Sequence, residues 1–469
     1  MLKSRLIQVL RTFSKKEFRE LNKWVNSPFH NQRADVIALY NYLMNANHLF
    51  DDGLLNKVLI FNKIYPNEKF DDSRMRQVMH FMFKEVEKFL IYEEFIKQKI
   101  GNKILLTKIY RRKKLPKLFL KEVAQTKDLQ QNTTIRNDLF YYDSYILEHE
   151  IYNFTSESQR VSNHNLQEVS DALDTSFIIS KLRQNCLMLA HKAVYKVEYK
   201  QTFLNEIITF IEDNNLLELK TVSIYYYLYQ MLAEVNEEKN YYLLKELILT
   251  NFNSFPEIEV RGIFLFAINF CIKKRNSGVK KFTQEAFDLY KKGFDEKFFI
   301  EDGIINSHTF RNAISIALVL GKYLWVENFI NEYGLYLDEN IRDTNIKYNK
   351  ARLFFGKRDY QKAMNLVSQY EFKDILINLS AKTMLIKMYY ELSEFRTLES
   401  LLESMRAYIQ RKKVIGYHKD LYKNIVKYTK KLLKVNPYSK AQKEKLKVEI
   451  EAAKPLTEKA WLLKQLAEL

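Results

Sequence analysis

The chain has 469 residues, an apolar fraction of 47%, and 75 Lys and Arg against 57 Asp and Glu, which gives a net charge of +18. It contains only 10 Gly and 6 Pro. So few turn-forming residues argue against glycine-rich phosphate loops and against all-β folds with many tight turns. No stretch approaches the roughly 20 uncharged apolar residues of a membrane span. Composition therefore predicts an all-α protein without a membrane span.

The first 100 residues have the pattern of a compact helical domain. Ser14 and Glu17 form a capping box, in which each side chain satisfies a free amide at a helix start. Pro28 ends this helix, and further helices are expected over about 34–46, 54–64 and 72–98. Apolar residues recur at steps of three and four in the last of these, and we interpret the stripe as core: Met75, Val78, Met79, Met82, Val86, Phe89, Leu90 and Phe95.

Helical segments follow one another from residue 101 to about 415. Polar turns that hold an aromatic residue recur between apolar runs, at intervals of 42, 41, 41, 37 and 35 residues. This rhythm is typical of stacked helical hairpins, an α-α superhelix. The predicted structural aromatics of these turns are Tyr199, Tyr241, Phe282, Tyr323, Tyr360 and Phe395.

One of these hairpins, residues 351–363, resembles a tetratricopeptide repeat. Ala351 and Phe354 match the small and aromatic positions of its first helix, and Tyr360 and Ala363 match the turn and the second helix. Arg358 stands where the repeat usually has a turn glycine, whereas Gly321 keeps that glycine in the preceding unit. The resemblance implies a tetratricopeptide-like solenoid, but it covers one repeat well and its neighbours only in part.

The N-terminal part also resembles a family of uncharacterised bacterial all-helical proteins. The shared features are Phe13-Ser14, the segment 27–31, and Phe70-Asp71-Asp72 before the long helix. This resemblance supports the layout of helices and implies no chemistry.

Residues 416–469 form a third predicted segment. A basic helix is expected to about residue 435, followed by a Lys-rich helix over about 439–453 and a short amphipathic helix over 458–466. A solenoid needs its last apolar face covered, so we expect the final helix to cap the array. The alternative is that it docks on a partner or a membrane surface.

Two segments carry the whole net charge. Residues 101–122 hold eight Lys and Arg against one Glu, and residues 406–454 hold fifteen against four Asp and Glu. Basic segments attract phosphates or acidic proteins, although a Lys-rich helix face is commonly just solvated. If nucleic acid binds, Tyr422 and Tyr428 are candidates for stacking on bases. The candidate phosphate contacts are Arg111, Arg112, Lys113, Lys114, Arg411, Lys412, Lys413, Lys423, Lys427, Lys430, Lys431 and Lys434.

No motif in the sequence predicts catalysis, a metal or a cofactor. The eight His are scattered, and His149-Glu150 lacks a second ligand because position 153 is Asn. The cysteines, Cys186 and Cys271, lie in apolar helical text and are expected to be buried thiols. The acid pairs at 51–52, 71–72 and 301–302 are expected to cap helices. We therefore expect a protein that is not an enzyme.

Three functional hypotheses remain open. The first is a cytoplasmic protein-interaction scaffold that binds a protein or peptide on its helical-repeat surface. The second is an RNA-binding or ribonucleoprotein component that uses the basic segments. The third is a regulator in which residues 1–100 are the output domain and the repeats sense a peptide.

Overall fold

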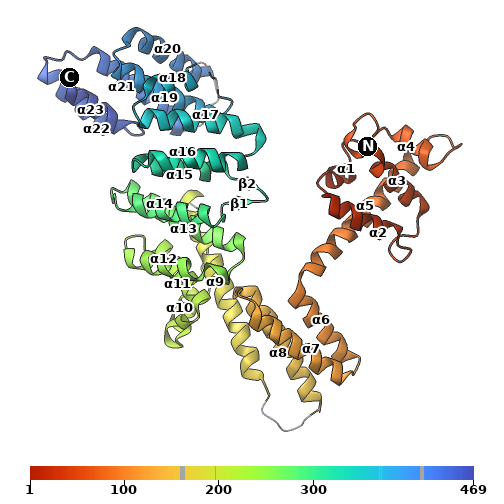
Figure 1. The fold of residues 1–469 in the computed structure, drawn as a ribbon. Coiled ribbons are helices and arrows are strands. Elements are labelled where there is room, and N and C mark those ends of the chain that lie inside the picture. Colours follow the sequence, from red (N-terminus) through yellow and green to blue (C-terminus); the bar gives the residue numbers. More distant parts are fainter. Residues whose placement is uncertain (159–163, 196, 369, 371, 412–416) are drawn as a thin grey trace. The chain divides into compact units, whose positions relative to one another are not determined.

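The computed structural model describes residues 1–469 except 159–163, 196, 369, 371 and 412–416 (Figure 1). Its contacts divide the chain into two compact units, Met1–Phe177 and Ile178–Leu469. The division falls inside one helix, α9 (Leu166–Tyr195). The described residues are almost entirely helical, as the composition predicted. The finer division of the sequence at residues 100 and 415 stays a prediction.

The first unit begins with helices that share one apolar core. They are α1 (Arg5–Leu10), α2 (Lys15–Asn26), α3 (Ala34–Met44), the 3-10 helix η1 (Asn45–Phe50), α4 (Lys57–Ile64) and α5 (Asp72–Lys97). The capping box of Ser14 and Glu17 is confirmed at the start of α2. Most of the predicted α5 stripe is buried in this core, but Phe95 is 42% exposed, so its assignment to the core is wrong. The helix α1 was not predicted.

The rest of the first unit is formed by α6 (Lys99–Arg112), α7 (Pro116–Asn132), α8 (Asp138–Ser158) and the beginning of α9. The helix α6 packs on α7 and on α8. Phe119 of α7 stacks on Phe154 of α8, with ring centroids 4.1 Å apart. This charge-rich segment therefore folds through apolar contacts between its helices.

The second unit is a succession of helices, each packed on the next along the chain (Figure 1). Between α14 (Phe282–Asp295) and α15 (Ser307–Val319), the strands β1 (Ile300–Glu301) and β2 (Ile304–Ile305) form an antiparallel hairpin, the only sheet of the described residues. It pairs Ile300 with Ile305 and Glu301 with Ile304. The helices are α10 (Leu204–Asp213), η2 (Leu216–Glu218), α11 (Lys220–Ala233), α12 (Glu238–Asn251), η3 (Phe252–Ser254), α13 (Glu257–Asn276), α14 (Phe282–Asp295), α15 (Ser307–Val319), α16 (Tyr323–Tyr333), η4 (Gly334–Tyr336), α17 (Glu339–Gly356), α18 (Tyr360–Val367), α19 (Ile375–Glu391) and α20 (Phe395–Arg411).

Several helices of this unit end in the same turn geometry. The second residue after α13, α15, α17 and α19 has a left-handed backbone: Gly278, Gly321, Arg358 and Ser393, with φ of 103°, 69°, 61° and 59°. After α15, Lys322 N–H donates to the Ala317 carbonyl and Gly321 N–H donates to that of Leu318. The same two hydrogen bonds recur after the other three helices, which is the Schellman motif. The same backbone turn therefore ends α13, α15, α17 and α19.

The turn aromatics lie mostly at the start of the second helix of each hairpin. A Cβ atom at Gly356 would lie 2.9 Å from Cε1 of Tyr323, so this ring packs directly on the first helix of the next hairpin. Tyr360 similarly donates to Glu391 of α19. Tyr199 differs, because it is 40% exposed between α9 and α10. Phe282, Tyr323, Tyr360 and Phe395 are the first residues of α14, α16, α18 and α20, and Tyr241 is the fourth residue of α12.

The chain ends in α21 (Tyr417–Lys434), α22 (Lys440–Ala452) and α23 (Lys459–Glu468). Their apolar residues join those of α19 and α20 in one core cluster. Trp461 of α23 is 8% exposed, and its indole N–H donates to Glu391 of α19 at 2.8 Å. None of the helices in the described ranges combines the length and the apolar character that crossing a membrane requires.

Candidate binding grooves of the second unit

One groove of about 490 Å³ lies along α18, α19 and α20. The helix α19 contributes one face, spaced by three and four residues, that includes Asn378 and Lys382. The facing side of α20 is richer in hydroxyls and ends in Arg411. The lining residues include these two cations and no Asp or Glu. The groove therefore offers hydrogen-bond donors and positive charge.

Asn378 is the least expected member of this lining. It is 2% exposed, and its Oδ1 accepts from the Phe372 N–H at 3.3 Å. Its Nδ2 is buried and has no hydrogen-bond partner in the part of the chain that the structure describes. A buried donor left without a partner costs about 1–3 kcal/mol. A ligand acceptor that reached this nitrogen would recover the cost.

A second polar site lies on the first helices of earlier hairpins. The guanidinium of Arg352 on α17 donates to Asn349 at 2.9 Å and to Ser315 of α15 at 2.7 Å. It forms no ion pair with any described residue, and burial lowers its pKa. Cationic and amide groups thus lie on α17 as well as on α19.

The predicted basic residues of the first unit are not all available for a ligand. Arg111 is paired with Glu150 at 2.8 Å and with Glu157 at 3.3 Å, and its side chain is 17% exposed. The hydrogen bond with Glu150 raises the pKa of Arg111. Arg112, Lys113 and Lys114 are exposed at the end of α6, where Lys114 takes the left-handed position of another Schellman turn. Positive charge there suits the helix dipole.

In the C-terminal basic segment, three predicted lysines come together. Lys423, Lys427 and Lys430 line a groove of about 470 Å³ between α20 and α21, together with Arg406. Lys430 is paired with Glu403, and Lys431 with Glu449. Arg411 belongs to the groove along α18–α20, and Lys434 is exposed at the end of α21. Lys412 and Lys413 lie outside the described residues.

The two tyrosines proposed to stack on bases do not present their rings. Tyr422 is 7% exposed, and its hydroxyl lies 2.8 Å from that of Ser380. Tyr428 is 6% exposed in the same core cluster. Their spacing among lysines reflects the apolar face of α21 and provides no stacking platform.

The cysteines and the paired acidic residues, which could act as nucleophiles or metal ligands, have structural roles. Burial raises the pKa of both thiols, that of Cys271 to about 12, and both are free. The described residues contain no cluster of metal-ligating side chains. Asp71 caps α5 as expected, but Asp52 pairs with Arg11 instead. The capping role expected for residues 301–302 is wrong, because Glu301 belongs to the strand β1 and Asp302 to the turn that follows it.

Comparisons with protein-family models, with curated proteins and with solved structures gave no match to this chain. Sequence reasoning found the lysines of α21 through their charge. It missed Asn378 and Arg352, because a single Asn or Arg in helical text carries no signal of burial.

Proposed function

We propose that the protein is a non-catalytic, cytoplasmic interaction scaffold whose hairpins form a tetratricopeptide-like superhelix. The groove along α18–α20 would bind an acidic peptide segment of a partner protein. The observation that carries this proposal is the buried Nδ2 of Asn378, which lacks an acceptor in a groove that has cations and no carboxylate among its lining residues.

Packing at the best tetratricopeptide match supports the superhelix. Ala351 of α17 and Ala363 of α18 are fully buried in one cluster, next to Tyr360. Small residues at facing positions allow two helices to approach closely. Together with the repeated Schellman turns, this favours regular stacking of the hairpins.

The experiment is affinity purification of the full chain from native lysate with nuclease treatment. We expect a defined protein to be recovered with the wild type and to be lost with the double variant Lys382→Glu/Arg411→Glu. The matched control is Arg396→Glu/Lys440→Glu, which makes the same change in charge at two exposed positions outside the groove. Equal recovery of the same proteins by the wild type and the double variant would contradict the proposed groove.

A second candidate function, binding of RNA, is favoured by the groove between α20 and α21. Arg406, Lys423 and Lys427 line it without a carboxylate among the lining residues. If RNA binds there, the affinity falls steeply with salt and Lys423→Glu/Lys427→Glu weakens it. Lys440→Glu/Lys445→Glu, on exposed positions of α22, makes the same change in charge elsewhere. This function would be excluded if the affinity for RNA changed neither with salt nor in the Lys423→Glu/Lys427→Glu variant.

A further inference from the structure

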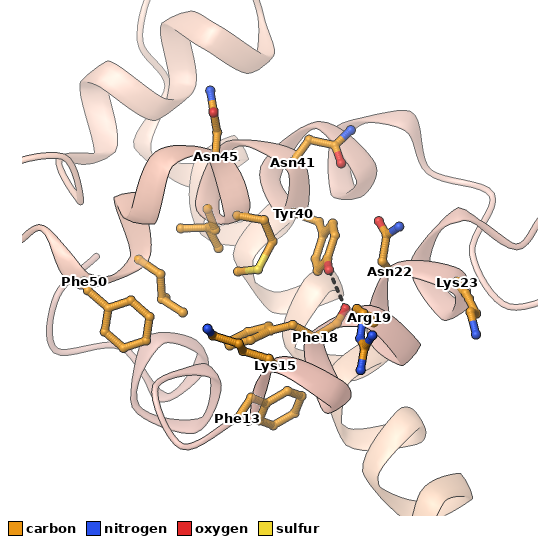
Figure 2. A pocket seen from close by; sticks show the side chains of 13 residues that line it. Phe13, Lys15, Phe18, Arg19, Asn22, Lys23, Tyr40, Asn41, Asn45 and Phe50 are labelled. Carbon is orange, nitrogen blue, oxygen red and sulfur yellow. Dashed lines mark hydrogen bonds between the residues drawn. The ribbon is translucent and has the colours of Figure 1, made fainter.

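A groove of about 1070 Å³ lies on the N-terminal helices of the first unit. One wall is a single face of α2, formed by Lys15, Phe18, Arg19, Asn22 and Lys23 at helical spacing. The opposite wall is the end of α3 and the following η1. Figure 2 shows Phe50 at one end of this groove and Lys23 at the other. The groove thus runs between α2 on one side and α3 with η1 on the other.

The floor of the groove is apolar and fixed by the core beneath it. Phe18 is half-buried, and Phe50 is 58% exposed. The Tyr40 hydroxyl donates to the Phe18 carbonyl at 2.7 Å and ties α3 to α2 (Figure 2). Arg11 Nε donates to the Leu49 carbonyl at 3.1 Å and holds the wall formed by η1. A groove held in this way is formed before any ligand arrives.

The charged residues that α2 contributes to the groove lining are all cations. Lys15, Arg19 and Lys23 belong to the lining, which contains no Asp or Glu. Neither Lys15 nor Arg19 forms an ion pair within the described ranges, and Lys23 pairs with Glu20 while its side chain stays 73% exposed. Glu17 is engaged in the capping box. Lys15 and Arg19 are therefore available to a ligand.

We propose that this groove binds an amphipathic helix of another protein, with its apolar stripe on the floor and acidic residues toward α2. The α2 face from Lys15 to Lys23 spans about 12 Å, a little over two helical turns. Apolar burial between flanking helices is the usual way in which a groove takes a helical segment, and the basic wall adds selectivity for acidic ones. This site is separate from the peptide groove of the proposed function.

The chain itself is a poor occupant of this groove. Its last amphipathic helix, α23, already buries Trp461, Leu462 and Leu466 in the C-terminal core. A second copy carries a net charge of +18 and would meet the basic wall with like charge. An acidic partner helix is the occupant that satisfies both the floor and the wall.

The test uses the full chain and fluorescein-labelled amphipathic peptides of about 14 residues, a length at which helices begin to form. The probe has Leu at helical spacing and Glu elsewhere. One comparison peptide replaces each Glu by Lys, and another replaces each Leu by Ser. Fluorescence anisotropy should show binding of the probe and not of the comparison peptides. No binding of the probe at roughly 1 mM would overturn the proposal.

Variants locate the binding. Lys15→Glu/Arg19→Glu should weaken the binding of the probe peptide roughly tenfold or more. Phe50→Ser should weaken this binding as well. The matched control, Lys16→Glu/Lys63→Glu, makes the same charge change at exposed positions outside the lining and should bind as the wild type. Lys15 is the first residue of α2, where a Glu suits the helix dipole, and Arg19 is exposed, so the fold should be kept, as a thermal melt would verify.

Two further outcomes decide against the proposal. One is equal loss of binding in the test and control variants, because only general charge would then matter. The other is binding of phosphatidylglycerol vesicles through Lys15 and Arg19 without binding of the peptide, which would make the groove a membrane contact.

Discussion

Arg358 occupies, after α17, the same left-handed backbone position that Gly321 occupies after α15, with φ of 61° and 69°. The hydrogen bonds of the two turns are equivalent: Asp359 N–H donates to the Phe354 carbonyl, as Lys322 N–H donates to that of Ala317. A side chain in this region costs about 1–2 kcal/mol relative to glycine. The second unit therefore tolerates after α17 a backbone strain that the glycine avoids after α15.

The first prediction follows from this pair. Arg358→Gly should raise the free energy of unfolding of the second unit by about 0.5–1 kcal/mol, since the exposed Arg358 side chain makes no hydrogen bond or ion pair with described residues. Gly321→Ala should lower it by about 1 kcal/mol. Urea unfolding measures both. A stabilising effect of Gly321→Ala would show that the left-handed turn is not kept in solution.

The second prediction compares two glycines inside neighbouring helices. A Cβ at Gly293 of α14 would lie 2.3 Å from Cε2 of Phe299, so Gly293→Ala should destabilise the unit by about 2 kcal/mol. A Cβ at Gly262 of α13 meets nothing within 4 Å, so Gly262→Ala should stabilise it by about 0.5–1 kcal/mol. Thermal melts that moved in the same direction for both variants would contradict this packing.

Sequence patterns predicted the helical fold because apolar spacing and capping are local signals. The capping box at Ser14 and the break at Pro28 depend only on neighbouring residues, and the structure shows both. The helix α1 was missed because its six residues are too few to show a helical spacing of apolar positions. The hairpin at residues 300–305 was missed because two-residue strands leave no alternation to detect.

The candidate sites were less accessible to sequence reasoning, because charge does not reveal pairing. Arg111 belongs to a basic run, yet Glu150, 39 residues away, neutralises it. Tyr428 lies among lysines, yet faces the core. The groove on α2 was hidden for the opposite reason: Lys15, Arg19 and Lys23 are ordinary helix-surface residues until η1 places an apolar wall beside them.

The third prediction concerns the covering role of α23. Trp461→Ala should cost about 3 kcal/mol, because it removes a buried ring and the hydrogen bond to Glu391. Trp461→Phe should cost less, since it keeps most of the apolar volume. Lys464→Ala changes an exposed residue of the same helix and should stay within about 0.5 kcal/mol of the wild type. Denaturant unfolding of the three variants tests this order of stability losses. A free energy of unfolding that Trp461→Ala left unchanged would mean that α23 does not cover this core.

The last prediction concerns alkaline pH at the N-terminal groove. Burial raises the pKa of Tyr40 to about 12, from an ordinary value of 10.0. A raised pKa of an acidic group means that its stabilisation is complete below pH 10 and is lost as the pH rises toward 12. Tyr40→Phe should therefore cost about 1 kcal/mol at neutral pH, from the lost hydrogen bond to Phe18, and this deficit should shrink and then reverse above pH 10. The contributions of the other tyrosines cancel in the difference between the unfolding free energies of the wild type and Tyr40→Phe. Tyr92→Phe, an exposed change on α5, controls for the loss of a hydroxyl. A deficit that stays constant from pH 7 to about 12 would mean that Tyr40 is not buried against α2 as the structure has it.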